Sequence, residues 1–246
     1  MAVQKILDRI CALESRTRDL ASGAELYRQG EKCGSYFLIT KGWIALSALL
    51  HDGQCQILDF VTPGALLGFP LLSSMVRSHS ARCITPARVV CYSEPQLTSA
   101  IVRDAELAVL LCRQAALDEW RAHDHLVNVC LRSARERIAH LLLELCTRIR
   151  GRIPSAGDTI RIPLTQAHIG QALGLTGVHV SRTLRVLREQ GIVRFIKRDL
   201  QILDSSALAR AAGMVGTASG LPPLSHRLPP SIGAWRFRGG EALPAA

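Results

Sequence analysis

The chain has 246 residues, a length that suits one large domain or two small ones. Hydrophobic residues make up 48% of it and charged residues 20%, which excludes a chain that is disordered as a whole. No apolar run reaches the ~18–20 residues of a membrane span, and the N-terminal segment MAVQKILDRICALESRTRD lacks the continuous apolar stretch of a secretory signal. We therefore expect a soluble, cytoplasmic protein without a membrane partner.

The positive charge of the chain is densest near its C-terminal end. Lys and Arg total 30 against 20 Asp and Glu, a net charge of +10. Residues 151–212 contain nine basic and four acidic side chains, a net charge of +5, whereas residues 104–150 contain seven of each. A basic surface suits polyanions, nucleic acid before acidic membranes, so this distribution favours a nucleic-acid-binding segment within residues 151–212.

The sequence from Ala24 to Ser93 is typical of short strands. The segments LYRQG, YFLIT, WIALSALL, QILDFV and ARVVCY alternate or run apolar over five to eight residues, and glycines separate them. This spacing predicts a compact antiparallel roll or barrel, and we assign residues 1–103 to an N-terminal domain of this kind.

Residues 104–150 are predicted to be helical. From residue 106 to 150 there is neither Gly nor Pro, and the apolar residues recur every three or four positions. A stretch of 45 residues is long for one helix, so we expect two. Ser133 and Glu136 have the spacing of a capping box at the start of the second helix.

The first of these helices carries an apolar stripe around Leu107, Leu111 and Leu126. A long apolar stripe at the edge of a small domain often pairs with its own copy, so we expect a homodimer held by this stripe. The alternative is that the stripe packs only within its own chain.

Residues 164–193 carry the pattern of a helix-turn-helix. Thr165 can cap a first helix, and Gly174 ends it because glycine adopts the left-handed conformation at little cost. Thr176 can cap a second helix, which Gly191 ends. Two short helices about a glycine-containing turn form a helix-turn-helix, and the following segment RFIKRDLQILD is typical of a β-hairpin.

We expect the second helix of this pair to enter the major groove of double-stranded DNA. Arg182 and Ser181 are the leading candidates to read bases, because the planar fork of an arginine matches the O6 and N7 acceptors of guanine. Val178 and His179 flank them. The candidate phosphate contacts are Thr165, Gln166, Arg185 and, at the tip of the predicted hairpin wing, Lys197 and Arg198.

Motifs of enzymes and of metal sites are absent from the sequence. There is no GxGxxG, P-loop, HExxH or GxSxG, so we predict no enzymatic activity. Eight cysteines occur without a CxxC pair, which removes the main support for a zinc ribbon, and we expect reduced thiols and no cofactor. His123 and His125 look like a metal pair, but residues two apart on a helix point away from each other.

The last 34 residues, 213–246, contain five Pro and six Gly without any periodicity. This composition predicts a disordered tail. The preceding residues 151–212 then form a DNA-binding domain, and residues 104–150 form a helical segment between the two domains.

In the order and spacing of these segments, residues 20–212 resemble the Crp/Fnr family of bacterial transcription regulators. ELYRQGEKCGSYFLITKGWIAL resembles the first strands of the family's roll, and VTPGALLGF resembles its later glycine turn. SARERIAHLLLEL resembles the helix after the dimer helix, and LTQAHIGQALGLTGVHVSRTLRVLREQGIV resembles the DNA-binding motif. The resemblance implies an α+β protein with an N-terminal antiparallel β-roll sensor, a long dimerisation helix and a C-terminal winged helix-turn-helix. It also implies a homodimer that binds a palindromic operator and acts through RNA polymerase.

The base-reading positions depart from the family at one residue. Members of the family usually carry E-x-x-(S/G)-R; Ser181 and Arg182 match it, but Val178 occupies the Glu position. An apolar side chain cannot accept a hydrogen bond from a cytosine amino group, whereas it can contact a thymine methyl. We therefore expect DNA binding to an operator that differs from the family's usual one.

The positions that hold an effector also depart from the family. The cyclic-AMP members carry a Glu in a G-E-L turn and a later Arg-Ser pair. Residues 68–71, GFPL, lack this Glu, although Arg77 and Ser78 match the later pair. A cyclic nucleotide needs both its ribose hydroxyl and its phosphate held, so the missing Glu argues against cyclic AMP.

An iron–sulfur cluster is disfavoured for a similar reason. The oxygen-sensing members bind a cluster through closely spaced N-terminal cysteines and one in the roll, and four thiolates are needed. Cys91 lies near the roll position, but the N-terminal part offers only Cys11 and then Cys33. The alternative that stays open is a ligand- or redox-gated sensor whose Cys or His residues bind a metal or cluster.

Overall fold

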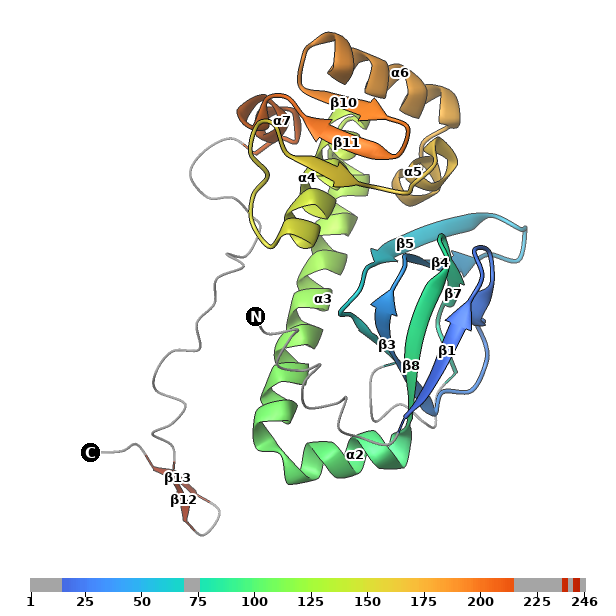
Figure 1. The fold of residues 1–246 in the computed structure, drawn as a ribbon, viewed down its shortest axis with the longest axis vertical. Helices are drawn as coiled ribbons and strands as arrows, with labels where there is room; N and C mark the ends of the chain where they lie inside the picture. The colour runs from blue at the N-terminus through green and yellow to red at the C-terminus, as the bar shows by residue number, and fades with distance from the viewer. Residues whose placement is uncertain (1–14, 69–75, 215–235, 239–240, 244–246) are drawn as a thin grey trace.

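The computed structural model describes residues 15–68, 76–214, 236–238 and 241–243 (Figure 1). Its N-terminal part contains two antiparallel sheets of four strands each, which confirm the predicted β-roll. One sheet has the order β1-β8-β3-β6, with the bounds Arg16–Leu20, Ala87–Ser93, Ser35–Lys41 and Leu66–Leu67. The other has the order β2-β7-β4-β5, with the bounds Glu25–Tyr27, Ser80–Cys83, Ile44–Leu49 and Cys55–Val61.

Strand β3 is buried on both of its faces, which explains its uninterrupted apolar sequence. Alternate residues of a strand point to opposite faces of the sheet. Phe37 and Ile39 lie in the interior of the roll. Tyr36 and Leu38 lie on the outer face, where they pack against the helices that follow the roll.

Three helices follow the roll. Helix α2, Glu94–Arg103, begins with Pro95 in its first turn, where the missing N–H of proline costs nothing. Helix α3, Ala105–Leu131, and helix α4, Ala134–Arg150, confirm the two predicted helices. Ser133 and Glu136 form the predicted capping box at the start of α4.

The predicted dimer stripe on α3 is wrong at two of its three residues. Leu107 and Leu111 are 1% and 4% exposed, because they pack against the outer face of the roll together with Tyr36 and Leu97. Leu126 is 58% exposed and belongs to a different face of the helix. The spacing of apolar residues along a helix does not reveal which of them its own chain buries. Helix α3 has apolar residues both on the face that the roll covers and on an exposed face.

The C-terminal part is a winged helix-turn-helix, as predicted. It contains β9 (Thr159–Arg161), α5 (Gln166–Leu173), α6 (Gly177–Glu189), β10 (Val193–Ile196), β11 (Asp199–Ile202) and α7 (Ser205–Ala211). The three strands form a sheet in the order β10-β11-β9. Helix α4 packs against α5, α6 and α7, so it lies in the core of this C-terminal part.

The predicted disorder of residues 213–246 falls mostly outside the described residues. Two short strands of this segment, β12 (Arg236–Arg238) and β13 (Glu241–Leu243), pair with each other in an antiparallel arrangement.

The roll and the C-terminal part share one hydrophobic cluster. Ala45, Ile57 and Phe60 of the roll pack in the same cluster as buried residues of α4 and α5, among them Leu142 and Leu173. The C-terminal part is therefore held at one end of the roll, with α6 at the end of the molecule farthest from α2 (Figure 1). Within the described ranges, no helix is both long and apolar enough to cross a membrane.

Candidate nucleic-acid interface

The helix-turn-helix forms through the caps that its sequence predicts. The Oγ1 atom of Thr165 accepts a hydrogen bond from the backbone N–H of His168 at 3.1 Å, and Thr176 accepts one from His179 at 3.3 Å. Gly174 ends α5 in the left-handed conformation with a φ of +64°. These local features end α5 and begin α6 on the two sides of a compact turn.

A second glycine allows the two helices to approach each other. A Cβ atom added to Gly170 would lie 2.5 Å from the carbonyl oxygen of Leu175, which is too close for any side chain. The Gly170 carbonyl accepts a hydrogen bond from the backbone N–H of Leu175 at 3.0 Å. Glycine at this position therefore sets how closely the turn packs on α5, a role that the sequence analysis did not identify.

Helix α6 has one buried face and one exposed face. Val180 and Leu187 are fully buried and fix the helix to the core of the domain. The five predicted residues of this helix are all exposed, and the apolar Val178 has 69% of its surface in contact with solvent. An apolar side chain this exposed at the start of a basic helix is available to a partner. The exposed set is Val178, His179, Ser181, Arg182 and Arg185.

The exposed side chains of α6 differ in their contacts. Arg185 forms an ion pair with Glu189, with Nε 3.3 Å from Oε1, and both side chains remain more than half exposed. His179 places Nδ1 3.2 Å from the Thr176 hydroxyl, so its ring lies over the N-terminus of the helix. For Arg182, the described part of the chain shows neither an ion pair nor a side-chain hydrogen bond, which leaves its guanidinium free for a ligand.

The wing lies next to the N-terminus of α5. Lys197 and Arg198 form the exposed turn between β10 and β11, and Lys197 adopts a φ of +57°, which is unusual for a residue other than glycine. The Arg198 carbonyl accepts a hydrogen bond from Ile162 at 2.8 Å, which fixes the turn to the segment before α5. Burial and the nearby charge of Arg198 lower the pKa of His168 in the first turn of α5.

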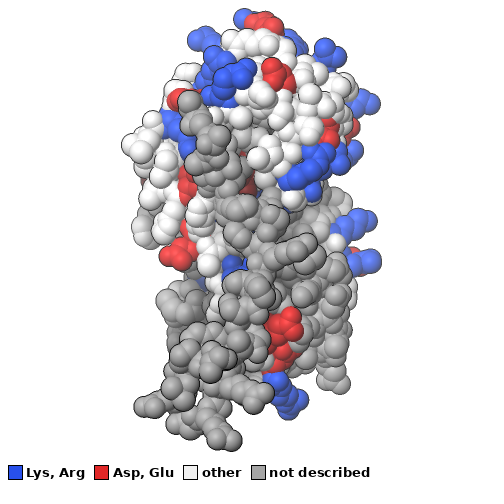
Figure 2. All heavy atoms as spheres, turned by 90° about the vertical axis from the view of Figure 1, so that its left-hand side faces the viewer, with Lys and Arg blue, Asp and Glu red and all other residues white. Residues whose placement is uncertain are grey.

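Four of the five predicted phosphate contacts thus lie at two neighbouring places, the wing tip and the start of α5, and the fifth, Arg185, lies on α6. Thr165 and Gln166 are exposed at the N-terminus of α5, where unpaired backbone N–H groups and the helix dipole favour an anion. On the face shown in Figure 2, Lys and Arg side chains gather over the upper part of the molecule, where the C-terminal domain lies.

The C-terminal end of α5 is held by side chains from three other elements. The carbonyl oxygen of Ala172 accepts a hydrogen bond from Nε2 of Gln56 in β5 at 2.9 Å, and it also interacts with His125 of α3. The next carbonyl, that of Leu173, accepts from Nη1 of Arg137 in α4 at 3.2 Å. These contacts orient the helix-turn-helix relative to the roll and α3. The sequence gives no signal for them, because their partners lie far apart along the chain.

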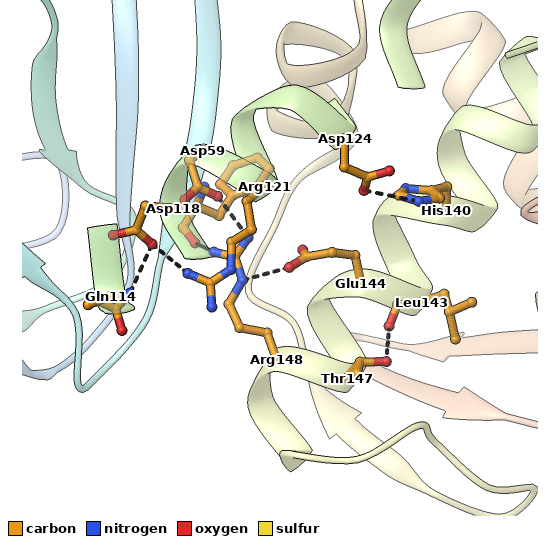
Figure 3. A network of polar contacts seen from close by, with 11 residues as sticks. Asp59, Gln114, Asp118, Arg121, Asp124, His140, Leu143, Glu144, Thr147 and Arg148 are labelled. Carbon is orange, nitrogen blue, oxygen red and sulfur yellow. Dashed lines mark hydrogen bonds and ion pairs between the residues drawn. The ribbon is translucent and has the colours of Figure 1, made fainter. Parts of the chain in front are cut away.

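A buried arginine reinforces the same junction (Figure 3). Arg148 of α4 is 12% exposed and donates to three acceptors: Oε1 of Glu144 at 2.8 Å, Oδ1 of Asp59 at 2.9 Å and the carbonyl of Phe60 at 2.6 Å. Although burial lowers the pKa of Arg148, the carboxylates of Asp59 and Glu144 outweigh it and raise this pKa. The guanidinium therefore stays charged and joins α4 to β5.

The two histidines of α3, His123 and His125, lie in different surroundings. Asp124, between them, points towards α4, where its Oδ2 lies 3.2 Å from Nε2 of the buried His140 (Figure 3). His123 is exposed, whereas burial lowers the pKa of His125. In the described part of the chain, no three His, Cys, Asp or Glu side chains are grouped closely enough to hold a metal ion.

Comparisons with known proteins match both halves of the chain. Residues 17–104 match the cyclic nucleotide-binding domain, and residues 136–211 match the Crp-like helix-turn-helix domain. The nitrogen fixation regulation protein FixK of Rhizobium meliloti is 31% identical over 182 residues, which cover 74% of this chain and 79% of that protein. The chain belongs to the Crp/Fnr family of transcription regulators. It is accordingly a DNA-binding regulator of transcription and not an enzyme.

Two further Crp/Fnr proteins match over most of their length. The transcriptional activator protein Anr of Pseudomonas aeruginosa is 29% identical over 207 residues, which cover 84% of each chain. The structure of FixK2 from Bradyrhizobium japonicum superposes with a TM-score of 0.73 at 27% identity, and the match covers 84% of this chain and all of that one.

Among the described residues of the roll, the arginine that would hold the phosphate of a cyclic nucleotide is already engaged by groups of its own chain. Arg77, which matches the family's phosphate-binding arginine, is 7% exposed. Its guanidinium lies 4.0 Å from the centre of the Tyr27 ring, and Nη2 donates to the carbonyl of Ser35 at 2.7 Å. Gly68 packs so closely on this group that an added Cβ would lie 3.1 Å from Nη1. Arg77 thus acts as part of the core of the roll. The turn in which the family carries its Glu falls partly on residues 69–75, outside the described residues.

Of the cysteines near the expected cluster positions, the two that the structure describes belong to no group of three possible metal ligands within the described residues. Cys91 is half-buried in β8, and burial raises the pKa of its thiol above the usual value. Cys33 is half-buried, and Cys11 lies outside the described residues.

Proposed function

We propose that this Crp/Fnr regulator acts as a homodimer that binds a palindromic operator, with α6 of each copy in the major groove of one half-site. Arg182 and Ser181 read bases, Val178 and His179 flank them, and the wing and the first turn of α5 contact phosphates. The exposed guanidinium of Arg182, on a helix whose opposite face is fully buried, is the observation that carries this proposal.

The geometry of α6 supports the assignment of the base-reading residues. Val178, Arg182 and Arg185 follow one another at intervals of four and three residues, so they lie along one exposed face of the helix. The N-terminal residues of a recognition helix are those that approach base edges. The assignment therefore places Val178 and Arg182 nearest to the bases and Arg185 nearer to the backbone.

The dimer is supported by an exposed face of α3. Seven residues of this face, spaced alternately by three and four positions, follow the 3.5-residue repeat of a two-stranded coiled coil. Leu126 is 58% exposed and Val109 is 37% exposed, although both are apolar. We call this face the α3 stripe; it consists of Val109, Cys112, Ala116, Glu119, His123, Leu126 and Cys130.

The position of α6 supports a parallel arrangement of the two α3 helices in the proposed dimer. In each copy α6 lies near the C-terminal end of α3, beyond α4 (Figure 1). Both recognition helices must reach the same side of one DNA duplex, so the two α3 helices run parallel about a two-fold axis. The α3 stripe of one copy then faces the α3 stripe of the other along its whole length.

We further propose that the dimer controls transcription through RNA polymerase in the cytoplasm. The name of the relative Anr as a transcriptional activator supports a contact with the polymerase.

The experiment that tests this proposal is selection of bound sites from a random double-stranded DNA pool with the full chain. We expect an enriched palindrome whose half-sites are centred roughly one helical turn, ~10–11 base pairs, apart. Enrichment of a single half-site would contradict the homodimer, and no enrichment over the input pool would contradict sequence-specific binding.

A further inference from the structure

Two of the seven residues of the α3 stripe are cysteines. Cys112 and Cys130 are both exposed, and their separation of 18 positions corresponds to about five turns of an α-helix, which returns to the same face. Elsewhere in the described part of the chain, Cys83 and Cys146 are buried and Cys33 and Cys91 are half-buried. One further thiol among the described residues is exposed, that of Cys55, and it lies on β5 and not on α3.

The two-fold axis of the proposed dimer places each of these thiols beside the same thiol of the second copy. In a parallel pair of helices with a 3.5-residue repeat, a residue of the seam lies beside the same residue of the other helix. Cys112 therefore faces Cys112 of the second copy, and Cys130 faces Cys130 of the second copy.

The expected distances suit a disulfide bond. Helices packed in this way have axes ~8–10 Å apart, which brings facing Cα atoms to within roughly 6 Å of each other. A disulfide needs Cα atoms about 4.4–6.8 Å apart. A thiol on the seam is held opposite its partner by the dimer itself, so no further movement of the backbone is needed.

We propose that Cys112 and Cys130 are redox-sensitive modification sites at which a hydroperoxide links the two copies of the dimer by disulfide bonds. This inference rests on the proposed homodimer. The thiolate of one cysteine attacks the O–O bond of hydrogen peroxide, which gives a sulfenic acid and releases hydroxide. The thiol of the second copy then displaces water and forms the S–S bond. For each bond, two thiols are oxidised and one peroxide is reduced to two molecules of water.

Oxidation would change the dimer from a concentration-dependent complex into a covalent one. A dimer held only by the apolar residues of the α3 stripe dissociates on dilution, and its apparent stability depends on protein concentration. A disulfide across the seam removes this dependence. The DNA-binding form of the regulator then persists at dilutions where the reduced chain dissociates.

The test compares the full chain under reducing conditions and after treatment with hydrogen peroxide. Light scattering of the reduced protein gives its oligomeric state, and a non-reducing denaturing gel of the oxidised protein shows covalent dimers. We expect the mass on the gel to double after oxidation and to return to that of the monomer with dithiothreitol. Mass spectrometry of digested protein should show peptides linked through Cys112 or Cys130.

The control variants separate the stripe from other thiols. The double variant Cys112→Ser, Cys130→Ser should remain a dimer in light scattering and lose the covalent band, whereas Cys55→Ser should behave as the wild type does. A covalent band that persists in the double variant would overturn the inference, and so would a reduced wild-type dimer that peroxide does not link. A reduced wild-type monomer would instead refute the proposed homodimer, and this inference with it.

Discussion

Arg148 binds Asp59 across the junction between the two halves of the chain, with Nη2 2.9 Å from Oδ1. The same guanidinium reaches Glu144 on its own helix, so a buried cation is shared between two carboxylates (Figure 3). Asp59 and Arg148 are 89 positions apart, and the segment between them includes the whole of α2 and α3. The contact therefore fixes how the DNA-binding domain is placed on the roll.

The first prediction concerns this contact. Arg148→Met should lower the free energy of unfolding by ~3–5 kcal/mol, because it leaves the carboxylates of Asp59 and Glu144 without their cation at a buried position. Asp59→Asn should cost less, about 1 kcal/mol, because the amide oxygen still accepts a hydrogen bond. Urea unfolding followed by circular dichroism measures both. Equal losses in the two variants would contradict this expectation, because they would show that the contribution of Arg148 depends almost entirely on the charge of Asp59.

The second prediction concerns the pH dependence of stability through His168. Burial and Arg198 lower the pKa of this residue, so the unfolded chain takes up the proton at a higher pH than the folded one does. Such a group stabilises the fold above its unfolded pKa of about 6.5, and this stability is lost as the pH falls below that value. A protonated Nδ1 also cannot accept the hydrogen bond that it receives from the Thr165 backbone at 3.3 Å.

Urea unfolding between about pH 7.5 and 5.5 should therefore show a stability that declines with acid. His168→Gln should flatten this decline, because glutamine preserves the capping box without titrating. The matched control is His51→Gln in the exposed turn between β4 and β5, which should keep the slope of the wild type. If the stability of the His168→Gln variant declined with acid as steeply as that of the wild type, His168 would not be the group responsible.

The sequence was sufficient wherever a local pattern determines the structure. The strands with apolar runs, the two helices from residue 104 to 150 and the caps at Thr165 and Thr176 were all predicted. Strand β1 was not, because its sequence RTRDL has no apolar alternation and the strand is held at the edge of the sheet by pairing with β8 and by the ion pair of Asp19 with Arg88.

The parts that could not be predicted depend on contacts between distant residues. Leu107 and Leu126 have the same residue type on the same helix, yet the roll covers only the first. Gln56 and Ala172 are 116 residues apart, and nothing in either neighbourhood indicates that they meet. Similarly, Arg77 matches the family's motif, but its stacking on Tyr27 follows from the closure of the roll.

The third prediction tests the α3 stripe. Leu126→Glu should shift the protein towards monomers, because it would place an unpaired charge in a desolvated interface. Leu131→Glu is the matched control: Leu131 is 79% exposed on the same helix but lies outside the 3.5-residue repeat of the stripe. Light scattering over a dilution series distinguishes the two variants. Dissociation by both, or by neither, would mean that the stripe is not the interface.

The fourth prediction concerns Arg182. Arg182→Ala should cost ~1–3 kcal/mol of binding free energy on the selected operator and should hardly change binding to unrelated DNA. Arg188→Ala is the matched control, because it also removes one positive charge from α6. The exposed Arg188 lies at a different angle around the helix axis, so its loss should leave the preference for the operator unchanged. Titrations of both DNAs at one salt concentration measure the difference. An equal loss on both DNAs with Arg182→Ala would identify a phosphate contact.

The last prediction concerns Val178, where this chain leaves its family. A glutamate would accept a hydrogen bond from a cytosine amino group and favour a C·G pair, whereas valine offers only methyl groups, whose partner in the major groove is the thymine C5-methyl. Burial of an unpaired cytosine amine against valine also costs free energy. Each half-site should therefore prefer T, or tolerate any base, opposite Val178, and it should still require G opposite Arg182.

Val178→Glu should move the preference towards C·G at that single position by ~1–3 kcal/mol and leave the rest of the site unchanged. His179 is the neighbour most able to interfere, but its Nδ1 lies 3.2 Å from the Thr176 hydroxyl, which holds its ring over the N-terminus of α6. The measurement is a binding series over all four base pairs at this position for the wild type and the variant. Identical profiles would mean that residue 178 does not face a base, although 69% of the surface of Val178 is exposed in the free protein.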